Sequence, residues 1–342
     1  MSPRGNSEAP SINADCACIA FDSDANINNG NPDLRDEIYL FDRMTGIITQ
    51  VTSDPDEDSR EPSVNADCTL IAFRSDADID DNPENNSEIY IFDTVAGTFT
   101  QITFTTSGTS RDPSINASGT RVAFQSTANI NNGNADTNDE IYLFDTTTGI
   151  FTQITFTTSG TSEEPSISAD GTRVAFSSNA NINGGNPDGN REMYFYDTTT
   201  GIITQITDEP DGNSDDAAIS GDGMRIGFDS RANINGGNPE GNEEVYIFDI
   251  ITGIITQLTD EPTGDSEDPA LSADGTYIAF ESEADINGGN TDDDNEEVYL
   301  ATCFDPATAR NIPTLSEWGL IAMAGVLGII GFFAVRRTMA RA

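Results

Sequence analysis

The sequence lacks two residue types on which enzyme active sites often depend. It contains no histidine, and all 15 of its positively charged residues are arginines, so lysine is also absent. These absences exclude Ser-His-Asp and Cys-His catalysis, histidine-ligated zinc and a lysine Schiff base. The sequence also has no GxSxG, GxGxxG or GxxxxGK[ST] motif. We therefore expect a protein that is not an enzyme.

Positive charge as a whole is scarce. The 342 residues include 59 Asp and Glu, which gives a formal net charge of −44. Nucleic acid is excluded as a partner, because binding phosphates requires a basic surface. Hydrophobic residues still make up 36% of the chain, too many for a disordered acidic tail, and this length can bury a core. The composition therefore predicts a folded acidic protein.

A motif recurs six times along the chain. The fourth copy is Pro165-Ser166-Ile167, and the copies start at residues 10, 62, 113, 165, 217 and 269. In the fourth unit we predict strands at 165–168, 172–177, 192–197 and 202–207, because each run is short, β-branched or aromatic, and bounded by turn residues. An Asp170-Gly171 hairpin turn joins the first two. Helical spacing is absent, so this part is all-β.

Four antiparallel strands repeated at this length are typical of a propeller. We predict an all-β, six-bladed β-propeller of four-stranded antiparallel blades over residues 1–304, a linker at 305–311, and one C-terminal transmembrane helix within 312–342. A stacked β-solenoid is the alternative, although its repeats are usually shorter. The sequences PSISADGTRVAFSS (165–178) and EIYLFD (140–145) resemble blades of TolB-type propellers. The resemblance covers residues 10–304 and lacks the α/β domain of TolB, so it implies the fold and not TolB's periplasmic role.

The sixth unit differs from the others. The fourth strand appears five times, and the sixth unit continues instead into Asp305-Pro306. Either residues 303–312 fill this place irregularly, or the protein begins upstream of Met1. An open sheet edge is a liability, and residues 1–15 contain no apolar secretory segment. We favour a start codon assigned too late.

The strand order predicts that acidic residues gather on one face of the propeller. In residues 208–259, two carboxylates, Asp222 and Asp249, belong to the face formed by the hairpin turns. The other nine belong to the opposite face: Asp208, Glu209, Asp211, Asp215, Asp216, Asp229, Glu240, Glu243 and Glu244. Such crowding weakens the compact state unless cations, salt or a partner offset it.

Oxygen-bearing side chains alternate in three of the long loops, as they do in a loop that wraps Ca²⁺. These candidate calcium ligands are Asn134, Asp136, Asn138, Glu140, Asn186, Asp188, Asn190, Glu192, Asn238, Glu240, Asn242 and Glu244. The first half resembles an EF-hand loop, but the Glu expected at position 12 and the flanking helices are missing. The alternative interpretation is that Asn, Asp and Gly simply form turns.

The four cysteines, Cys16, Cys18, Cys68 and Cys303, permit three full pairings. Cys16 and Cys68 occupy the same hairpin position in adjacent units. If the ring closes, the sixth unit lies beside the first, and a bond from Cys303 to Cys16 or Cys18 would clasp it. This expectation requires export to an oxidising compartment and Cα atoms within about 7 Å.

The C-terminal region predicts a membrane anchor. Residues 318–335 carry no charge and span about 27 Å as a helix. Arg336, Arg337 and Arg341 follow, and the positive-inside rule keeps them cytoplasmic. The propeller is therefore expected in the periplasm, anchored to the inner membrane.

The same region resembles a sorting signal. The motif Ile312, Pro313, Thr314, Leu315, Ser316, Glu317, Trp318, Gly319, followed by an apolar segment and arginines, is similar to the IPTL-type C-terminal sorting domain of Gram-negative bacteria. This resemblance implies export, anchoring, processing by an exosortase-like enzyme and transfer to the cell surface.

The leading hypothesis for function is a binding platform: an exported, anchored or surface-sorted propeller that binds a protein or glycan and carries calcium. One rival is a metal-dependent lactonase-like or esterase-like hydrolase using the propeller channel, and another is a purely structural envelope protein. A channel metal needs carboxylates pointing inward from the first strands. We expect none there, because the inward positions are Ser11/Asn13, Ser63/Asn65, Ser114/Asn116, Ser166/Ser168, Ala218/Ser220 and Ala270/Ser272.

Overall fold

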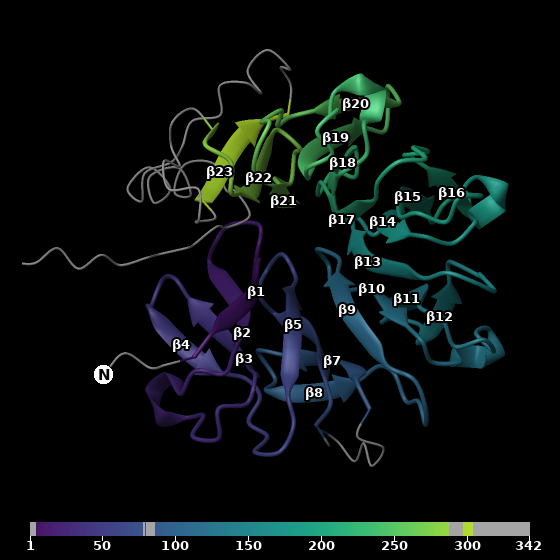
Figure 1. Cartoon of the computed structure of the whole chain (residues 1–342). Coiled ribbons are helices and arrows are strands. Elements are labelled where there is room, and N and C mark those ends of the chain that lie inside the picture. The colour runs from purple at the N-terminus through teal and green to yellow at the C-terminus, as the bar shows by residue number, and fades with distance from the viewer. Residues whose placement is uncertain (1–4, 78, 80–85, 287–296, 304–342) are drawn as a thin grey trace, which may run out of the picture.

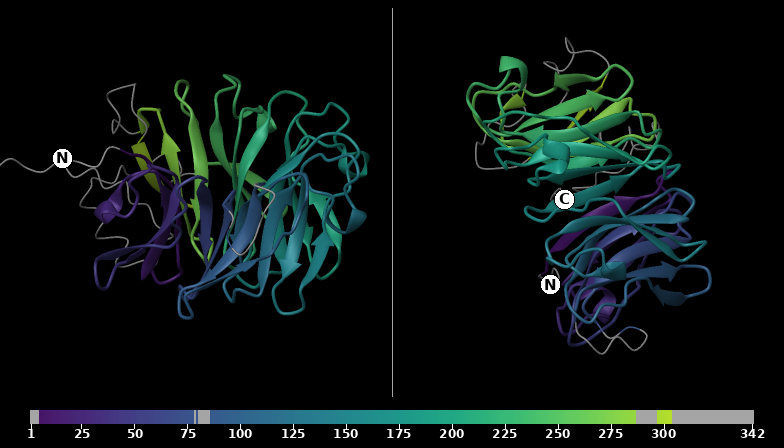
Figure 2. Two further views of the ribbon diagram at one scale, coloured as in Figure 1. Left: turned by 90° about the horizontal axis from the view of Figure 1, so that it is seen from below. Right: turned by 90° about the vertical axis from the view of Figure 1, so that its right-hand side faces the viewer.

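The computed structural model describes residues 5–77, 79, 86–286 and 297–303. The chain forms six antiparallel sheets that follow one another around a common axis (Figure 1). The prediction of an all-β, six-bladed propeller is confirmed, and the solenoid alternative is wrong. The strands of each blade run from one face of the disc to the other (Figure 2), so the connections lie on the two faces.

Each blade is a meander of consecutive strands. The strands are β1 (Ser7–Ile12), β2 (Cys18–Ser23), β3 (Glu37–Asp42) and β4 (Ile47–Gln50); β5 (Ser59–Val64), β6 (Leu70–Ser75), β7 (Glu88–Asp93) and β8 (Thr98–Gln101); β9 (Ser110–Ile115), β10 (Arg121–Ser126), β11 (Glu140–Asp145) and β12 (Ile150–Gln153); β13 (Ser162–Ile167), β14 (Arg173–Ser178), β15 (Glu192–Asp197) and β16 (Ile202–Gln205); β17 (Ser214–Ile219), β18 (Arg225–Ser230), β19 (Glu244–Asp249) and β20 (Ile254–Gln257); and β21 (Ser266–Leu271), β22 (Tyr277–Ser282) and β23 (Glu297–Thr302). In the described ranges, 3-10 turns lie at Ile27–Asn29, Ile130–Asn132, Ile182–Gly184 and Ile234–Gly236.

The core lies between neighbouring blades. The second strand of a blade is buried on both faces because each sheet packs against a sheet on either side. Phe176 of β14 stacks on Tyr194 of β15 with 5.7 Å between ring centroids. On its other side Phe176 joins a cluster with Ile141 and Leu143 of the preceding blade. Similar clusters join each consecutive pair of blades from the first to the sixth.

The predicted hairpin turns are present on one face. Gly171 has a φ of +71°, a conformation that glycine adopts without steric cost. Asp170 Oδ1 accepts hydrogen bonds from the Ser168 hydroxyl and from the Thr172 backbone N–H, which closes the turn. The same hairpin position in the first two blades is occupied by Cys16 and Cys68, also at positive φ.

The first strand of each blade is longer than the sequence predicts. In the fourth blade β13 starts at Ser162, three residues before Pro165. Its register with β14 is interrupted between Glu163 and Ser166, which marks a β-bulge. The polar residues before the proline show no alternating hydrophobic pattern, so the extension leaves no periodic signal. This bulge shapes the candidate site described below.

The sixth blade has three strands among the described residues, β21, β22 and β23. The residues expected to fill the place of a fourth strand lie outside the described ranges, so both explanations stay predictions. The linker at 305–311, the sorting motif, the helix at 318–335 and the terminal arginines also lie outside them. Within the described ranges, no helix has the length and apolar character required to cross a membrane.

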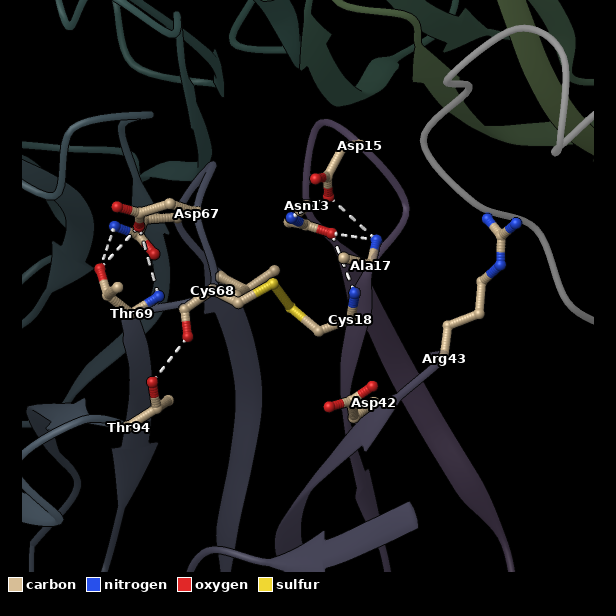
Figure 3. Close-up of a disulfide and its surroundings, with 12 residues drawn as sticks. Asn13, Asp15, Ala17, Cys18, Asp42, Arg43, Asp67, Cys68, Thr69 and Thr94 are labelled. Atoms are coloured by element: carbon tan, nitrogen blue, oxygen red, sulfur yellow. Dashed lines mark hydrogen bonds between the residues drawn. A yellow bond between two sulfur atoms is a disulfide. The ribbon is translucent and has the colours of Figure 1, made fainter. Parts of the chain in front are cut away.

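A disulfide joins the first two blades. Cys18 at the start of β2 is bonded to Cys68 in the β5–β6 turn, with 6.3 Å between Cα atoms (Figure 3). The proposed bond from Cys303 to Cys18 is therefore wrong. The hairpin of a blade faces the start of the second strand of the preceding blade, as Gly171 faces Arg121. This geometry brings Cys68 to Cys18.

Cys303 lies elsewhere. It packs against the cluster between the fifth and sixth blades, and its backbone N–H donates to the Thr276 carbonyl. Burial raises the pKa of the Cys303 thiol to about 12, and the nearby Arg225 charge of the fifth blade opposes this effect. Since Cys303 faces the fifth blade and not the first, it forms no clasp with Cys16.

Candidate binding site

The first strands of the six blades surround the axis (Figure 1) and enclose a pocket of about 380 Å³. We call it the axial pocket. Carboxylates, prolines and serines dominate its wall, which comprises Ala9, Pro10, Glu61, Pro62, Ser63, Asp112, Pro113, Ser114, Glu164, Pro165, Ser166, Asp216, Ala217, Asp268 and Pro269. The expectation that the first strands place no acid in the channel is therefore wrong.

One position of the bulge supplies all of these carboxylates. It is the residue before the Pro-Ser motif, and its φ lies between 44° and 58° in every blade. Five blades carry an acid there, which we call the acid ring: Glu61, Asp112, Glu164, Asp216 and Asp268. The sixth member of the position is Ala9. The sequence signal was an acid preceding the motif in five of six repeats, and it was missed because the strand was expected to begin one residue later.

The left-handed backbone of the bulge links each blade to its neighbour. The Glu61 N–H donates to Asp22 Oδ2 at 2.8 Å, and the Asp112 N–H donates to Glu61 Oε2 at 2.8 Å. The Glu164 N–H donates to Gln125 Oε1 at 2.7 Å. Non-glycine residues rarely adopt positive φ, and the conformation persists where surrounding contacts determine it. These hydrogen bonds provide such contacts and fix the carboxylates at the axis.

A second set of side chains lies behind the acid ring. It is the fifth residue of the second strand in each blade: Asp22, Arg74, Gln125, Ser177, Asp229 and Glu281. Arg74 Nε donates to Glu61 Oε1 at 2.7 Å. Asp229 bonds to the Asp216 side chain and is only 2% exposed. Asp229, which the sequence assigns to the face of the long loops together with Asp216 and Glu243, is buried within β18.

Glu61 and Asp112 form one carboxyl pair of the ring. Their side chains are hydrogen-bonded to each other. Burial raises the pKa of Asp112, the adjacent Glu61 charge raises it further, and Arg111 opposes the shift. Two carboxylates in contact cannot both ionise without strong repulsion, so one keeps a proton. Since the pKa of Asp112 is raised to about 8, the proton resides mainly on Asp112.

Asp216 and Asp229 form the second pair. Burial is the largest cause of the raised pKa of both groups. The Asp216 charge raises the pKa of Asp229 further, whereas the hydrogen bond from Asp229 lowers that of Asp216. Glu164 and Asp268 also raise the pKa of Asp216, whereas Glu243 raises that of Asp229. Oδ1 of Asp229 has no hydrogen-bond partner among the described residues. This pair therefore also holds a proton near neutral pH, and one of its buried oxygens has spare accepting capacity.

The predicted calcium ligands lie away from the axis, on the face of the long loops. Asn190 Nδ2 donates to Glu192 Oε1 at 2.9 Å, to the Glu209 carbonyl at 2.6 Å and to the Gly212 carbonyl at 2.8 Å. The same arrangement recurs in Asn86/Glu88, Asn138/Glu140 and Asn242/Glu244. We call these four pairs the Asn–Glu staples, because each attaches a long loop to the link with the next blade.

The other predicted ligands divide into two groups. Asn134, Asn186 and Asn238 are buried and donate to the carbonyls of the staple asparagines at 2.7–2.8 Å. In contrast, Asp136, Asp188 and Glu240 are exposed to solvent. Burial raises the pKa of Glu192 and Glu244 to about 7.

The structure thus brings three of the four ligands of each loop together and places one outside. Oδ1 of Asn138, Asn190 and Asn242 is buried without a hydrogen-bond partner in the described ranges. No group of three or more His, Cys, Asp or Glu residues suited to a metal occurs in those ranges. Calcium binding by these loops stays a prediction.

Known proteins provide two kinds of comparison. An IPTL-CTERM motif matches residues 312–337. A comparison with curated proteins gives no match. TolB from Acinetobacter baumannii is similar in structure, with a TM-score of 0.54 and 20% identity over 91% of this chain. The chain spans 62% of that protein.

Two further structures are similar. Oligogalacturonate lyase from Vibrio parahaemolyticus has a TM-score of 0.61 and 12% identity, and the match covers 89% of this chain and 76% of the lyase. The β-propeller domain of the trilobed protease from Pyrococcus furiosus, which has an open velcro topology, has a TM-score of 0.55 and 15% identity. That match covers 88% of this chain and 84% of the domain. These similarities establish the fold only, so the chain is a propeller of TolB-like fold that ends in an IPTL-CTERM motif.

Proposed function

We propose that the protein is an exported, membrane-anchored or surface-sorted binding platform, and that its axial pocket binds a positively charged group of a partner protein. The observation that carries the proposal is the acid ring, in which the equivalent residue of five blades places a carboxylate in the wall of a pocket of about 380 Å³. A guanidinium or ammonium group matches such a ring, because charge-assisted hydrogen bonds to carboxylates are strong. The net charge of −44 would also attract cationic partners over a distance.

The IPTL-CTERM motif supports the cellular part of the proposal. We expect the propeller to lie on the outer side of the inner membrane or at the cell surface, after processing by an exosortase-like enzyme. Fractionation of cells that produce the full chain, together with N-terminal sequencing of the native protein, tests this placement. Recovery of the propeller only in the cytoplasm would contradict it.

Binding is tested by isothermal titration calorimetry with a tri-arginine peptide at low salt, with a tri-citrulline peptide as the uncharged reference. Replacing Glu61→Gln together with Glu164→Gln removes two charges of the acid ring. The expected loss of affinity is about tenfold or more, which corresponds to about 1.4 kcal/mol. The matched control is Asp56→Asn with Asp211→Asn, two exposed loop residues. Equal affinity of both double variants would contradict binding at the axis.

A metal-dependent hydrolase is the second candidate, because the axial pocket offers room for a small substrate. The described residues contain no group of three or more His, Cys, Asp or Glu suited to a metal, which ranks this candidate below the platform. A screen with lactone, ester and glycan substrates in the presence of Mn²⁺, Ca²⁺ or Zn²⁺ tests this candidate. Turnover abolished by Asp216→Asn would replace the platform proposal with the hydrolase. A purely structural envelope role would show neither binding nor turnover.

A further inference from the structure

The five carboxylates of the acid ring line the axial pocket, and three of them belong to two carboxyl pairs, Glu61 with Asp112 and Asp216 with the buried Asp229. Glu61 and Asp112 face the pocket from adjacent blades, and Asp216 faces it with Asp229 directly behind. Glu164 Oε2 accepts a hydrogen bond from the Asp216 N–H at 3.2 Å, so it adds negative charge between the two pairs. A cation that enters the pocket therefore meets carboxyl groups that are held together by shared protons.

We propose that binding of a guanidinium or ammonium group in the axial pocket displaces these shared protons, so that the pocket holds its partner at neutral pH and releases it in acid. The inference rests on the binding function proposed above and specifies how that binding is regulated. In each pair the O–H bond of the protonated carboxyl breaks, and the proton leaves to the solvent or buffer. The positive ligand then balances the second negative charge in its place.

The surroundings of the first pair favour this exchange. Burial and the Glu61 charge are the main causes of the raised pKa of Asp112, and the Glu164 charge raises it further. Two arginines lie nearby: Arg74 is bonded to Glu61, and Arg111 on β9 lies beside Asp112. Asp22 on β2 accepts the Glu61 N–H from the preceding blade. The arginines therefore stabilise the first negative charge, and the second requires an added cation.

Fewer positive charges offset the negative charge of the second pair, Asp216 and Asp229. Asp215 on β17 and Asp268 on β21 are acids that raise the pKa of Asp216, in addition to Glu164 on β13. Glu243, before β19, raises that of Asp229, while Arg231 forms an ion pair with Glu243 at 2.9 Å. Glu281 occupies the position on β22 that corresponds to Asp229. Oδ1 of Asp229 is buried and has no hydrogen-bond partner in the described part of the chain, so it can accept a hydrogen bond when a cation replaces the proton.

The exchange is measured by titrating the full chain with the tri-arginine peptide in phosphate and in Tris at pH 7, with EDTA present to remove divalent metals. These buffers differ in ionisation enthalpy, so the difference between observed binding enthalpies gives the number of protons released. We expect a release of about one proton or more per peptide, and weaker binding at pH 5 than at pH 8. This measurement requires no variant.

Asp112→Asn provides the test at the site, because asparagine keeps the shape and cannot ionise. The expected result is fewer protons released per peptide and a shallower dependence of affinity on pH. The matched control is Glu37→Gln, which replaces another buried carboxyl group whose pKa burial raises to about 7, away from the pocket. The control is expected to release as many protons as the native chain.

The outcomes separate the two proposals. If the peptide fails to bind, the platform function and this inference are both overturned. If it binds with the same enthalpy in both buffers, the platform function stands and the proton exchange is overturned. If Glu37→Gln lowers the release as much as Asp112→Asn does, the protons come from elsewhere in the protein and the assignment to the acid ring is wrong.

Discussion

Two regions of the blades differ in how closely their residues repeat from one blade to the next. On the face of the long loops the Asn–Glu staples are nearly identical in four blades, with the same donors, acceptors and carbonyl partners. At the axis the residue behind the acid ring is different in almost every blade and includes acids, an arginine, an amide and a serine. Both regions are largely buried and polar, and both connect adjacent blades.

The difference separates two kinds of requirement. The staples attach a long loop to the next blade link in the same way in four blades, so positions that carry the fold repeat. A pocket on the axis exists once per molecule, so each blade can contribute a different group to it. Variation among otherwise identical repeats therefore points to the axis as the functional region, and uniformity points to the staples as structural.

The disulfide gives the largest expected effect among positions assigned to structure. Replacing Cys18→Ser together with Cys68→Ser opens a covalent loop of 50 residues and should lower the free energy of unfolding by about 4 kcal/mol in a chain-entropy model. Urea denaturation measures this loss. Binding of the tri-arginine peptide should be unchanged.

Dithiothreitol provides the control for the disulfide. It should lower the urea midpoint of the native chain and leave the double variant unaffected. A midpoint of the native chain that does not respond to complete reduction would show that the bond contributes nothing to stability.

The staples give the next largest effect. Asn190→Ala removes the donor to Glu192 and to two backbone carbonyls, and should cost about 2–3 kcal/mol of unfolding free energy. Asp188→Ala, in the same loop but exposed, should change stability by less than about 0.5 kcal/mol. Both values come from urea denaturation monitored by circular dichroism.

Repeating these measurements with Ca²⁺ and with EDTA decides between the two interpretations of the loop. A purely structural staple loses the same free energy in both solutions. If the cost of Asn190→Ala appears only with Ca²⁺, and Asp188→Ala shows the same dependence, the loop is a calcium site as the sequence pattern suggested.

Much of the fold could be predicted from the sequence because its signals are local. The third strand, Glu192–Asp197, matches its predicted range, since alternating aromatic residues and flanking turns define it. The hairpin turn at Asp170-Gly171 is equally local. The blade count followed from the spacing of the repeats alone.

The axis could not be predicted, for a physical reason. Glu164 and its equivalents face the pocket because of a bulge, and a bulge depends on hydrogen bonds from the neighbouring blade, such as that between the Glu164 N–H and Gln125. No pattern within one repeat contains that partner. The pairing of Cys18 with Cys68 could not be predicted for the same reason, because it depends on which blade the hairpin of the second blade faces.

The last prediction concerns Asp229 at the axis, whose contribution to the free energy of unfolding depends on pH. Burial and the Asp216 charge raise the pKa of Asp229, so the native protein retains a proton there that the unfolded chain releases above about pH 4. The native state then binds more protons than the unfolded state, and stability falls as pH rises from that point. Asparagine cannot ionise and avoids this loss.

Asp229→Asn should therefore change the free energy of unfolding little at pH 4 and raise it by more than about 1 kcal/mol at pH 8, because each pH unit over which only the native state holds the proton costs about 1.4 kcal/mol. Urea denaturation at both pH values measures the difference, with the exposed Asp211→Asn as the charge-matched control. A stabilisation of the same size for both variants would indicate relief of the overall negative charge, and a stabilisation of equal size at pH 4 and pH 8 would show that the gain does not come from the proton on Asp229. If only Asp229→Asn gains stability, and only at high pH, the buried carboxyl pair at the axis lowers the stability of the native protein. Such a loss is expected in a region that is selected for binding a cation and not for stability.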